Sequence, residues 1–118
     1  MLVLAAATRP GVCQGVAAGR AAFEECRSCH ELDPAAGAAA GPNLAGLIGR
    51  PIAGDPGYGY SPALEQAGRG GARWTRETLE RYLEDPEAVV PGTWMTARVR
   101  DAAERRALID FLSDPNAR

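Results

Sequence analysis

Apolar residues in the first quarter of the chain recur every three or four positions, the spacing of one face of an amphipathic helix. The positions that follow this spacing are Val16, Gly19, Phe23 and Cys26. They predict a helix from residue 15 or 16 to residue 27. A glycine inside a helix costs about 1 kcal/mol relative to alanine, so Gly19 suggests that another helix approaches closely at this point.

Three further helices are predicted in the second half of the chain, where a capping residue precedes each apolar stripe. They span residues 62–67, 76–84 and 102–113, and they begin after Ser61, Thr75 and Asp101. The last helix carries Phe111 on its apolar face. We expect Phe111 to pack against Gly19, with Phe23 beside them, so that the first and last helices cross closely.

The remaining stretches show no sustained period and are rich in glycine and proline. Residues 31–60 and 86–97 are therefore expected to be loops. Residues 1–14 are expected to be a disordered leader or the remnant of a signal peptide, because their short apolar run follows no basic segment. A chain of 118 residues forms one domain, which we place at 15–118, and its class is all-α.

The candidate chemistry is concentrated in Cys26-Arg27-Ser28-Cys29-His30. This C-x-x-C-H pattern is the attachment signature of a c-type haem. Two thiols three positions apart can each add to a haem vinyl group, which gives two thioether bonds. The histidine that follows directly can then ligate the iron. The pattern therefore predicts covalent attachment through Cys26 and Cys29, with His30 as a metal ligand.

Two other chemistries use parts of this pattern. A C-x-x-C pair alone also occurs as a thioredoxin-like redox site, which normally lies in a strand–helix–strand context that this sequence lacks. With Cys13 the motif makes a Cys3His set of the kind that binds zinc. The adjacent residues Cys29 and His30 are poorly placed to hold one small ion together, and Cys13 otherwise has no evident role.

A second iron ligand follows by elimination. His30 is the only histidine, and Met95 is the only methionine besides Met1. Met95 lies in a loop that Pro91 and Gly92 restrict, whereas a methionine that merely fills a core needs no such placement. A histidine and methionine pair raises the reduction potential of a haem. The composition and the position of Met95 therefore predict that His30 and Met95 are the two protein ligands of the haem iron.

Other residues are candidates for the walls of the pocket. The carbonyl of Pro42 is placed to accept the imidazole N–H of His30, which would hold the ring. Arg50, Tyr60 and Trp74 carry donors that suit the carboxylates of a haem; otherwise they are a surface arginine and two core aromatics. We expect the hydroxyl of Tyr82 to point towards Met95.

Charge and composition argue against some classes of function. A net charge of −2 and a pI near 5.4 provide no electrostatic basis for binding nucleic acid. No stretch has the length of a transmembrane helix, so no membrane span is expected. Aromatic residues make up 6% of the chain, which is little material for a core. A bound haem would supply the missing apolar bulk.

These motifs occur in the order found in class I c-type cytochromes with one haem, and the chain resembles their mitochondrial-like bacterial members over residues 15–114. The resemblance is carried by Cys26-Arg27-Ser28-Cys29-His30, Gly41-Pro42-Asn43-Leu44, Tyr60-Ser61, Trp74, Asp85-Pro86, Pro91-Gly92-Thr93-Trp94-Met95 and Leu108-Ile109-Asp110-Phe111-Leu112. It implies a cytochrome c fold of four or five short helices, with loops wrapped around one covalently bound haem c.

The resemblance also implies a role for each site residue. Cys26 and Cys29 would be the thioether links, His30 and Met95 the axial iron ligands, Pro42 the carbonyl behind His30, Arg50, Tyr60 and Trp74 the neighbours of the propionates, and Tyr82 and Thr93 the residues on the methionine side. The implied activity is that of a soluble, monomeric electron carrier that cycles between ferrous and ferric iron and is not an enzyme.

The expected partners are redox proteins. They are a quinol-oxidising complex and a terminal oxidase, peroxidase or dehydrogenase, and the expected location is the bacterial periplasm, although an export signal is incomplete or missing in residues 1–14. Relatives often have a basic residue where this chain has Trp94. We therefore expect a docking patch of more apolar character around Ala45, Ile48 and Trp94.

Two other functions share these residues. The domain would serve equally well as the cytochrome subunit of a periplasmic dehydrogenase, which co-purification with a larger subunit would reveal. It would also serve as a haem-based gas sensor in which Met95 is displaced from the iron. Stable methionine ligation across a range of pH would count against the sensor.

Overall fold

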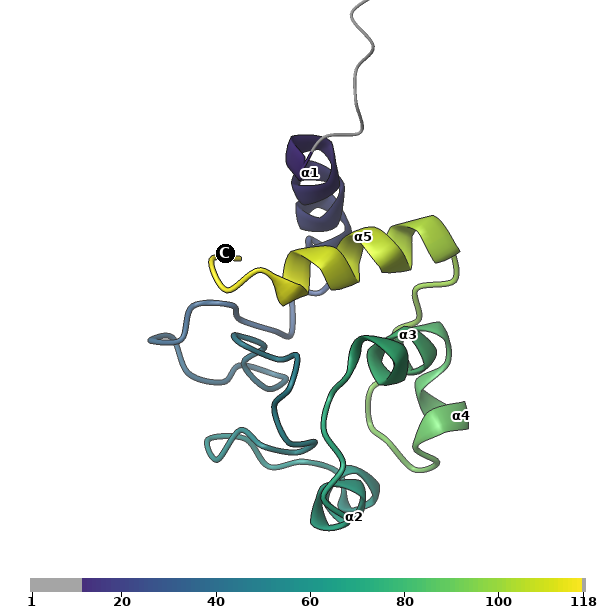
Figure 1. Cartoon of the computed structure of the whole chain (residues 1–118). Helices are drawn as coiled ribbons and strands as arrows, with labels where there is room; N and C mark the ends of the chain where they lie inside the picture. Colours follow the sequence, from purple (N-terminus) through teal and green to yellow (C-terminus); the bar gives the residue numbers. More distant parts are fainter. Residues whose placement is uncertain (1–11, 118) are drawn as a thin grey trace, which may run out of the picture.

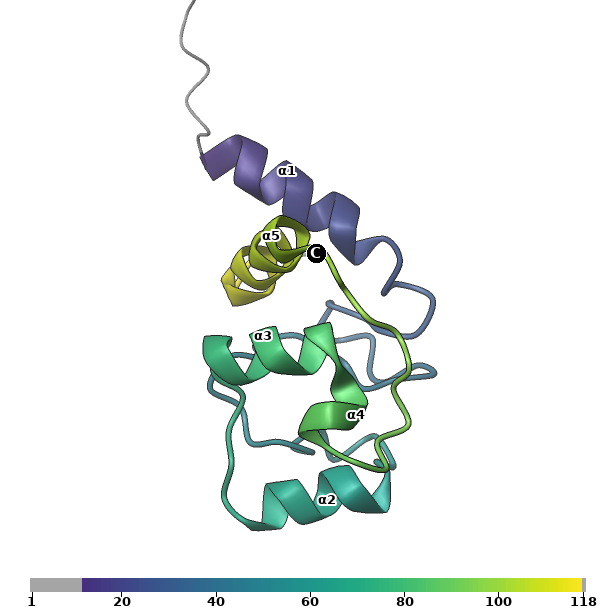
Figure 2. The same ribbon diagram turned by 90° about the vertical axis from the view of Figure 1, so that its right-hand side faces the viewer.

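The computed structural model describes residues 12–117, with side chains described from Ala17 onward. Its helices are α1 (Val12–Phe23), α2 (Pro62–Arg69), α3 (Arg76–Glu84), α4 (Pro86–Val89) and α5 (Ala102–Ser113). In the described part of the chain there is no strand, only an isolated bridge between Pro51 and Arg73. The all-α prediction is confirmed. Figures 1 and 2 show α1 and α5 crossing at one end of the molecule and α2 at the other.

The crossing of α1 and α5 depends on Gly19. A Cβ atom at Gly19 would lie 2.5 Å from the Cβ of Phe111 and would also meet the carbonyl oxygen of Ala107. The rings of Phe23 and Phe111 lie beside this contact, with centroids 5.8 Å apart. The predicted packing of Phe111 on Gly19 is therefore confirmed, because only a residue without a side chain permits this approach.

The predicted caps are present. The hydroxyls of Ser61 and Thr75 accept the amides of Leu64 (3.2 Å) and Thr78 (3.1 Å), and a carboxylate oxygen of Asp101 accepts the amide of Glu104 (3.0 Å). Each bond satisfies an amide that has no partner within its own helix. These local bonds explain why α2, α3 and α5 begin where the sequence predicted.

The boundaries of α1 and α2 differ from the prediction. α1 ends at Phe23 instead of residue 27, and the chain then turns through bonds such as His30 N to Cys26 O (2.9 Å). It begins at Val12 instead of residue 15 or 16, so residues 12–14 are helical. The rest of the predicted leader and the side chain of Cys13 lie outside the described residues. α2 continues to Arg69, two residues beyond the prediction.

α4 was not predicted, because residues 86–97 were expected to be a loop. Asp85 ends α3 and also caps α4, accepting the amide of Ala88 (3.4 Å), and Pro86 is the first residue of the new helix. Proline is well suited to that position, since the first helical amide needs no partner. Among the described helices, none is long and apolar enough to cross a membrane.

Candidate functional site

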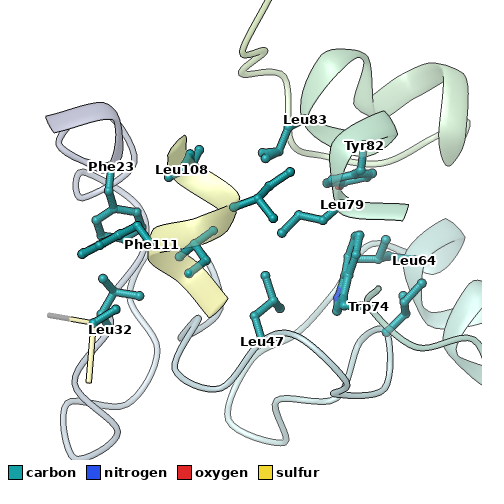
Figure 3. Packing of buried hydrophobic residues seen from close by; sticks show 14 of the residues in the cluster. Phe23, Leu32, Leu47, Leu64, Trp74, Leu79, Tyr82, Leu83, Leu108 and Phe111 are labelled. Carbon is teal, nitrogen blue, oxygen red and sulfur yellow. The ribbon is translucent and has the colours of Figure 1, made fainter. Parts of the chain in front are cut away.

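The helices and loops surround an open cavity with an empty volume of about 810 Å³. Its walls are mainly aliphatic and aromatic. In Figure 3, Leu79 and Leu83 of α3, Leu108 of α5, and Leu47 and Trp74 of the loops point towards a common space. A cavity whose walls carry so few polar groups is typical of a site for a bulky apolar ligand.

His30 lies in the wall of this cavity with its ring orientation fixed. Its Nδ1 lies 2.8 Å from the carbonyl oxygen of Pro42, as the sequence predicted. Burial lowers the pKa of His30, although the bond to Pro42 opposes this effect. The imidazole is therefore neutral at pH 7. Because a carbonyl can only accept, Nδ1 carries the proton and donates it, which leaves the lone pair of Nε2 available to a metal.

Gly41 lies close to the same edge of that ring, and its role was not predicted from the sequence. A Cβ at Gly41 would lie 2.7 Å from His30 Cε1 and 2.9 Å from Nδ1, and the amide of Gly41 donates to the carbonyl of Cys29 (2.6 Å). The only sequence signal was its place before Pro42. The turn at Gly41 and Pro42 therefore fixes the imidazole by direct contact and by a hydrogen bond.

The two thiols occupy different surroundings. Cys26 is half-buried in the cavity wall, whereas Cys29 is exposed and is not a wall residue, and both are free. Burial is the main cause that raises the pKa of the Cys26 thiol, with Glu25 adding to it. Among the described side chains, no group of three His, Cys, Asp or Glu residues converges on one point, so they form no zinc site.

Met95, Thr93 and Tyr82 line the cavity from the segment after α4 and from α3. The Tyr82 hydroxyl and Thr93 Oγ1 lie 2.6 Å apart. Tyr82 was expected to point towards Met95; its observed partner is Thr93, two residues earlier. Burial raises the pKa of Tyr82, so the phenol stays protonated at neutral pH. The pair ties the start of the methionine segment to α3.

Arg50, Tyr60 and Trp74 also line the cavity. The Nε of Arg50 is buried without a hydrogen-bond partner, while its Nη1 donates to the carbonyl of Ala45 (3.1 Å). The Tyr60 oxygen accepts the amide of Asp55 (2.9 Å), which leaves its own proton free to donate. An unpaired buried donor costs about 1–3 kcal/mol. A ligand that places a hydrogen-bond acceptor beside the Nε of Arg50 would remove this cost.

Tyr58 is a wall residue that the sequence analysis missed. Its hydroxyl donates to the carbonyl of Ala40 (3.1 Å), and its ring packs edge-to-face with the ring of Tyr60, with centroids 5.0 Å apart. Its position within a glycine-rich stretch carried no periodic signal. The bond to Ala40 draws the loop around Pro42 towards the loop around Tyr60, so Tyr58 helps to close the cavity.

These features fit a haem. The apolar walls suit the porphyrin, and the Cys26 thiol lies in the wall, where a vinyl group could reach it, while Cys29 lies exposed three residues further on. His30 and Met95, which both line the cavity, carry a ring nitrogen and a thioether sulfur of the kinds that can ligate haem iron. The unpaired Nε of Arg50 suits a propionate carboxylate.

Comparison with known proteins supports this interpretation. No family model matches the chain. It is 37% identical to the cytochrome c2 of Blastochloris viridis, covering 99% of this chain and 91% of that protein. It is 41% identical to the cytochrome c2 of Agrobacterium tumefaciens (strain II Chrys), covering 82% and 88%.

Solved structures give the same result. The cytochrome c2 structure from Rhodospirillum centenum superposes with a TM-score of 0.78 at 32% identity, covering 82% of this chain and 94% of that one. Both the sequence and the fold are thus shared across most of the chain. The chain therefore belongs to the class I c-type cytochromes, electron-transfer proteins that carry one covalently bound haem c.

Proposed function

We propose that Cys26 and Cys29 hold the haem of this electron-transfer protein and that His30 and Met95 are the axial ligands of its iron. The observation that supports this most directly is the collection of a fixed neutral imidazole, a thiol and a thioether in one otherwise apolar cavity. When bound, haem iron supplies one-electron chemistry between its ferrous and ferric states.

The chain's own residues would set the conditions for that chemistry. Pro42 and Gly41 hold the His30 ring, while the aliphatic walls exclude water. In this proposal Arg50, Tyr60 and Trp74 donate hydrogen bonds to the propionates, and Tyr82 and Thr93 shape the methionine side. A rigid, dry site limits rearrangement when an electron arrives or leaves.

We further propose that the chain is a carrier and not a catalyst. Its single histidine would be bound to iron, so it is not available as a general base for a serine or cysteine nucleophile. Both axial positions would also be filled by side chains, which leaves no open site for a substrate. Electron transfer between proteins then needs only a close approach to the haem edge.

The attachment can be tested on protein made together with a haem-maturation system. Intact wild-type protein should show the mass of one added haem and a reversible one-electron redox titration. A double variant, Cys26→Ala with Cys29→Ala, should show no covalent haem by mass after denaturation. Retention of covalent haem in that variant would assign the attachment to other residues, with Cys13 the remaining thiol.

The proposed partners are a quinol-oxidising complex as donor and a terminal oxidase, peroxidase or dehydrogenase as acceptor or donor, in the bacterial periplasm. Covalent haem attachment on the oxidising side of the bacterial membrane supports that location. We propose that the chain acts there as a monomer, meeting each partner through a small and transient interface.

Trp94 is the candidate anchor of that interface. It is 63% exposed, the one large hydrophobic side chain so exposed among the described residues, and it also borders the cavity. Its neighbours in the expected docking patch, Ala45 and Ile48, are half-buried. An exposed tryptophan beside the site is the kind of residue that contributes strongly to protein–protein binding.

We expect Trp94→Glu to slow electron transfer from a purified quinol-oxidising complex by about tenfold or more, because it removes the aromatic contact and adds a charge. Stopped-flow kinetics at low protein concentration would measure the second-order rate. Trp94→Phe is the matched control and should retain most of the rate. An unchanged rate in Trp94→Glu, at an unchanged reduction potential, would show that docking does not use this patch.

A further inference from the structure

Arg105 of α5 is the one charged side chain that is buried among the described residues, with 6% of its surface exposed. Its guanidinium reaches two carboxylates of α3: Nε lies 2.7 Å from Glu80 Oε1, and Nη2 lies 3.9 Å from Glu84 Oε2. Its Nη1 donates to the carbonyls of Val99 and Arg100, both at 2.9 Å. One planar group thus joins α3, α5 and the segment that follows Met95.

Further bonds fasten the same segment to α3. The amide of Val99 donates to the carbonyl of Leu83 (2.8 Å), and Nε of Arg98 donates to the carbonyl of Glu84 (2.8 Å). Figure 2 shows the segment after α4 returning along one side of the molecule to α5. Residues 98–100 therefore form a fixed anchor, and Arg105 is its buried centre.

A second anchor lies before Met95. The amide of Thr93 donates to the carbonyl of Val90 (3.0 Å), the amide of Gly92 donates to Glu87 Oε1 (3.0 Å), and the hydroxyl of Thr93 bonds Tyr82. Between the anchors, residues 94–97 form no hydrogen bond within the described part of the chain. Met95 thus lies in a short free span between two fixed ends.

We infer that Arg105 is a positioning residue for Met95: by holding the anchor at 98–100, it limits how readily Met95 leaves the iron to a small nitrogen-donor ligand. The inference rests on the proposed ligand role of Met95. Without the guanidinium, the carbonyls of Val99 and Arg100 lose their donor, and only the bonds of Arg98 and Val99 to α3 still hold the anchor, so it opens more readily and the free span is then longer. A longer span has more open conformations, which favours the displaced state.

The substitution Arg105→Lys tests whether the planar geometry of the guanidinium is needed, because it keeps the positive charge. The single ammonium of lysine cannot reproduce the planar fork that serves Glu80 and the two carbonyls together. The apparent affinity for an incoming ligand scales with the fraction of molecules in the open state. We therefore expect Arg105→Lys to bind imidazole about tenfold more tightly than the wild type in the ferric holoprotein.

The measurement is an imidazole titration of the ferric protein, followed by loss of the methionine-to-iron absorption band. Hydrogen exchange at the Val99 amide gives a readout that does not depend on added ligand, and it should be faster in Arg105→Lys. Glu80→Gln is a milder variant of the same cluster for the case in which Arg105→Lys does not fold. It should shift the imidazole affinity in the same direction by a smaller factor.

Arg76→Lys is the matched control. Arg76 also joins α3 to α5, through Asp110 and through Ser113 Oγ (2.9 Å), but it makes no hydrogen bond or ion pair with residues 96–100. The imidazole affinity of the Arg76→Lys variant should equal that of the wild type. The inference is wrong if folded Arg105→Lys and Glu80→Gln bind imidazole like the wild type, or if Arg76→Lys shows the same increase.

If the proposed assignment of Met95 as an iron ligand is wrong, the experiments would give a different result from the one that rules out Arg105 alone. If Met95 does not ligate the iron, the wild-type protein lacks the methionine-to-iron band before any imidazole is added. Met95→Ala would then bind imidazole like the wild type. That outcome overturns the inference together with the axial assignment, whereas a normal band with unchanged affinity in both Arg105→Lys and Glu80→Gln overturns the role of Arg105 alone.

Discussion

Replacing Met95 with alanine should lower the reduction potential of the holoprotein by on the order of 100 mV or more, because axial ligands are a main determinant of haem potentials. A thioether favours ferrous iron, and the small side chain of alanine cannot reach the metal, so water or an added ligand takes its place. Potentiometric titration measures the potential. The ferric methionine-to-iron absorption band should disappear in the same sample.

Thr96→Ala is a suitable control for this prediction. Thr96 is exposed and lies one residue from Met95 in the same free span, and it makes no hydrogen bond among the described residues. The reduction potential and the ferric spectrum of Thr96→Ala should match those of the wild type. If Met95→Ala also kept both properties, the sixth ligand would have to be another group, and the proposed role of Met95 would be wrong.

The sequence predicted the fold well wherever the signal was local. α2, α3 and α5 each combine a cap with an apolar stripe, and both features act within a few residues. α4 has only four residues, too few to display a period, and its cap Asp85 directly follows the last residue of α3. The end of α1 was misplaced because Cys26 continues the helical spacing, although the backbone already turns there.

In the site, too, only the features that depend on neighbouring residues could be predicted from the sequence. The attachment motif and the single histidine could be read directly, because their chemistry lies in adjacent residues. The roles of Gly41, Tyr58 and Arg105 could not, because each depends on a contact with a residue distant in the chain. Gly41 matters through the ring of His30, and Arg105 through carbonyls presented by another segment. Neither contact has a local sequence signature.

The contact between α1 and α5 carries the largest stability prediction. Phe23, Leu108 and Phe111 are almost completely buried where these helices meet. The surfaces fit because Gly19 has no side chain: an added Cβ would meet the Cβ of Phe111 at 2.5 Å and the backbone of Ala107. A backbone carbonyl cannot rotate away as a side chain can, so any substitution there must move the helices apart.

We expect Gly19→Ala to destabilise the ferric holoprotein by about 2 kcal/mol, since overpacking against the backbone costs about 3 kcal/mol and the gain in helix propensity offsets about 1 kcal/mol of it. The melting temperature should fall by roughly 10 °C. Gly59→Ala is the control, because its Cβ would meet nothing within 4 Å. Equal stability of Gly19→Ala and wild type in denaturant titrations would mean that the two helices do not cross as closely as described.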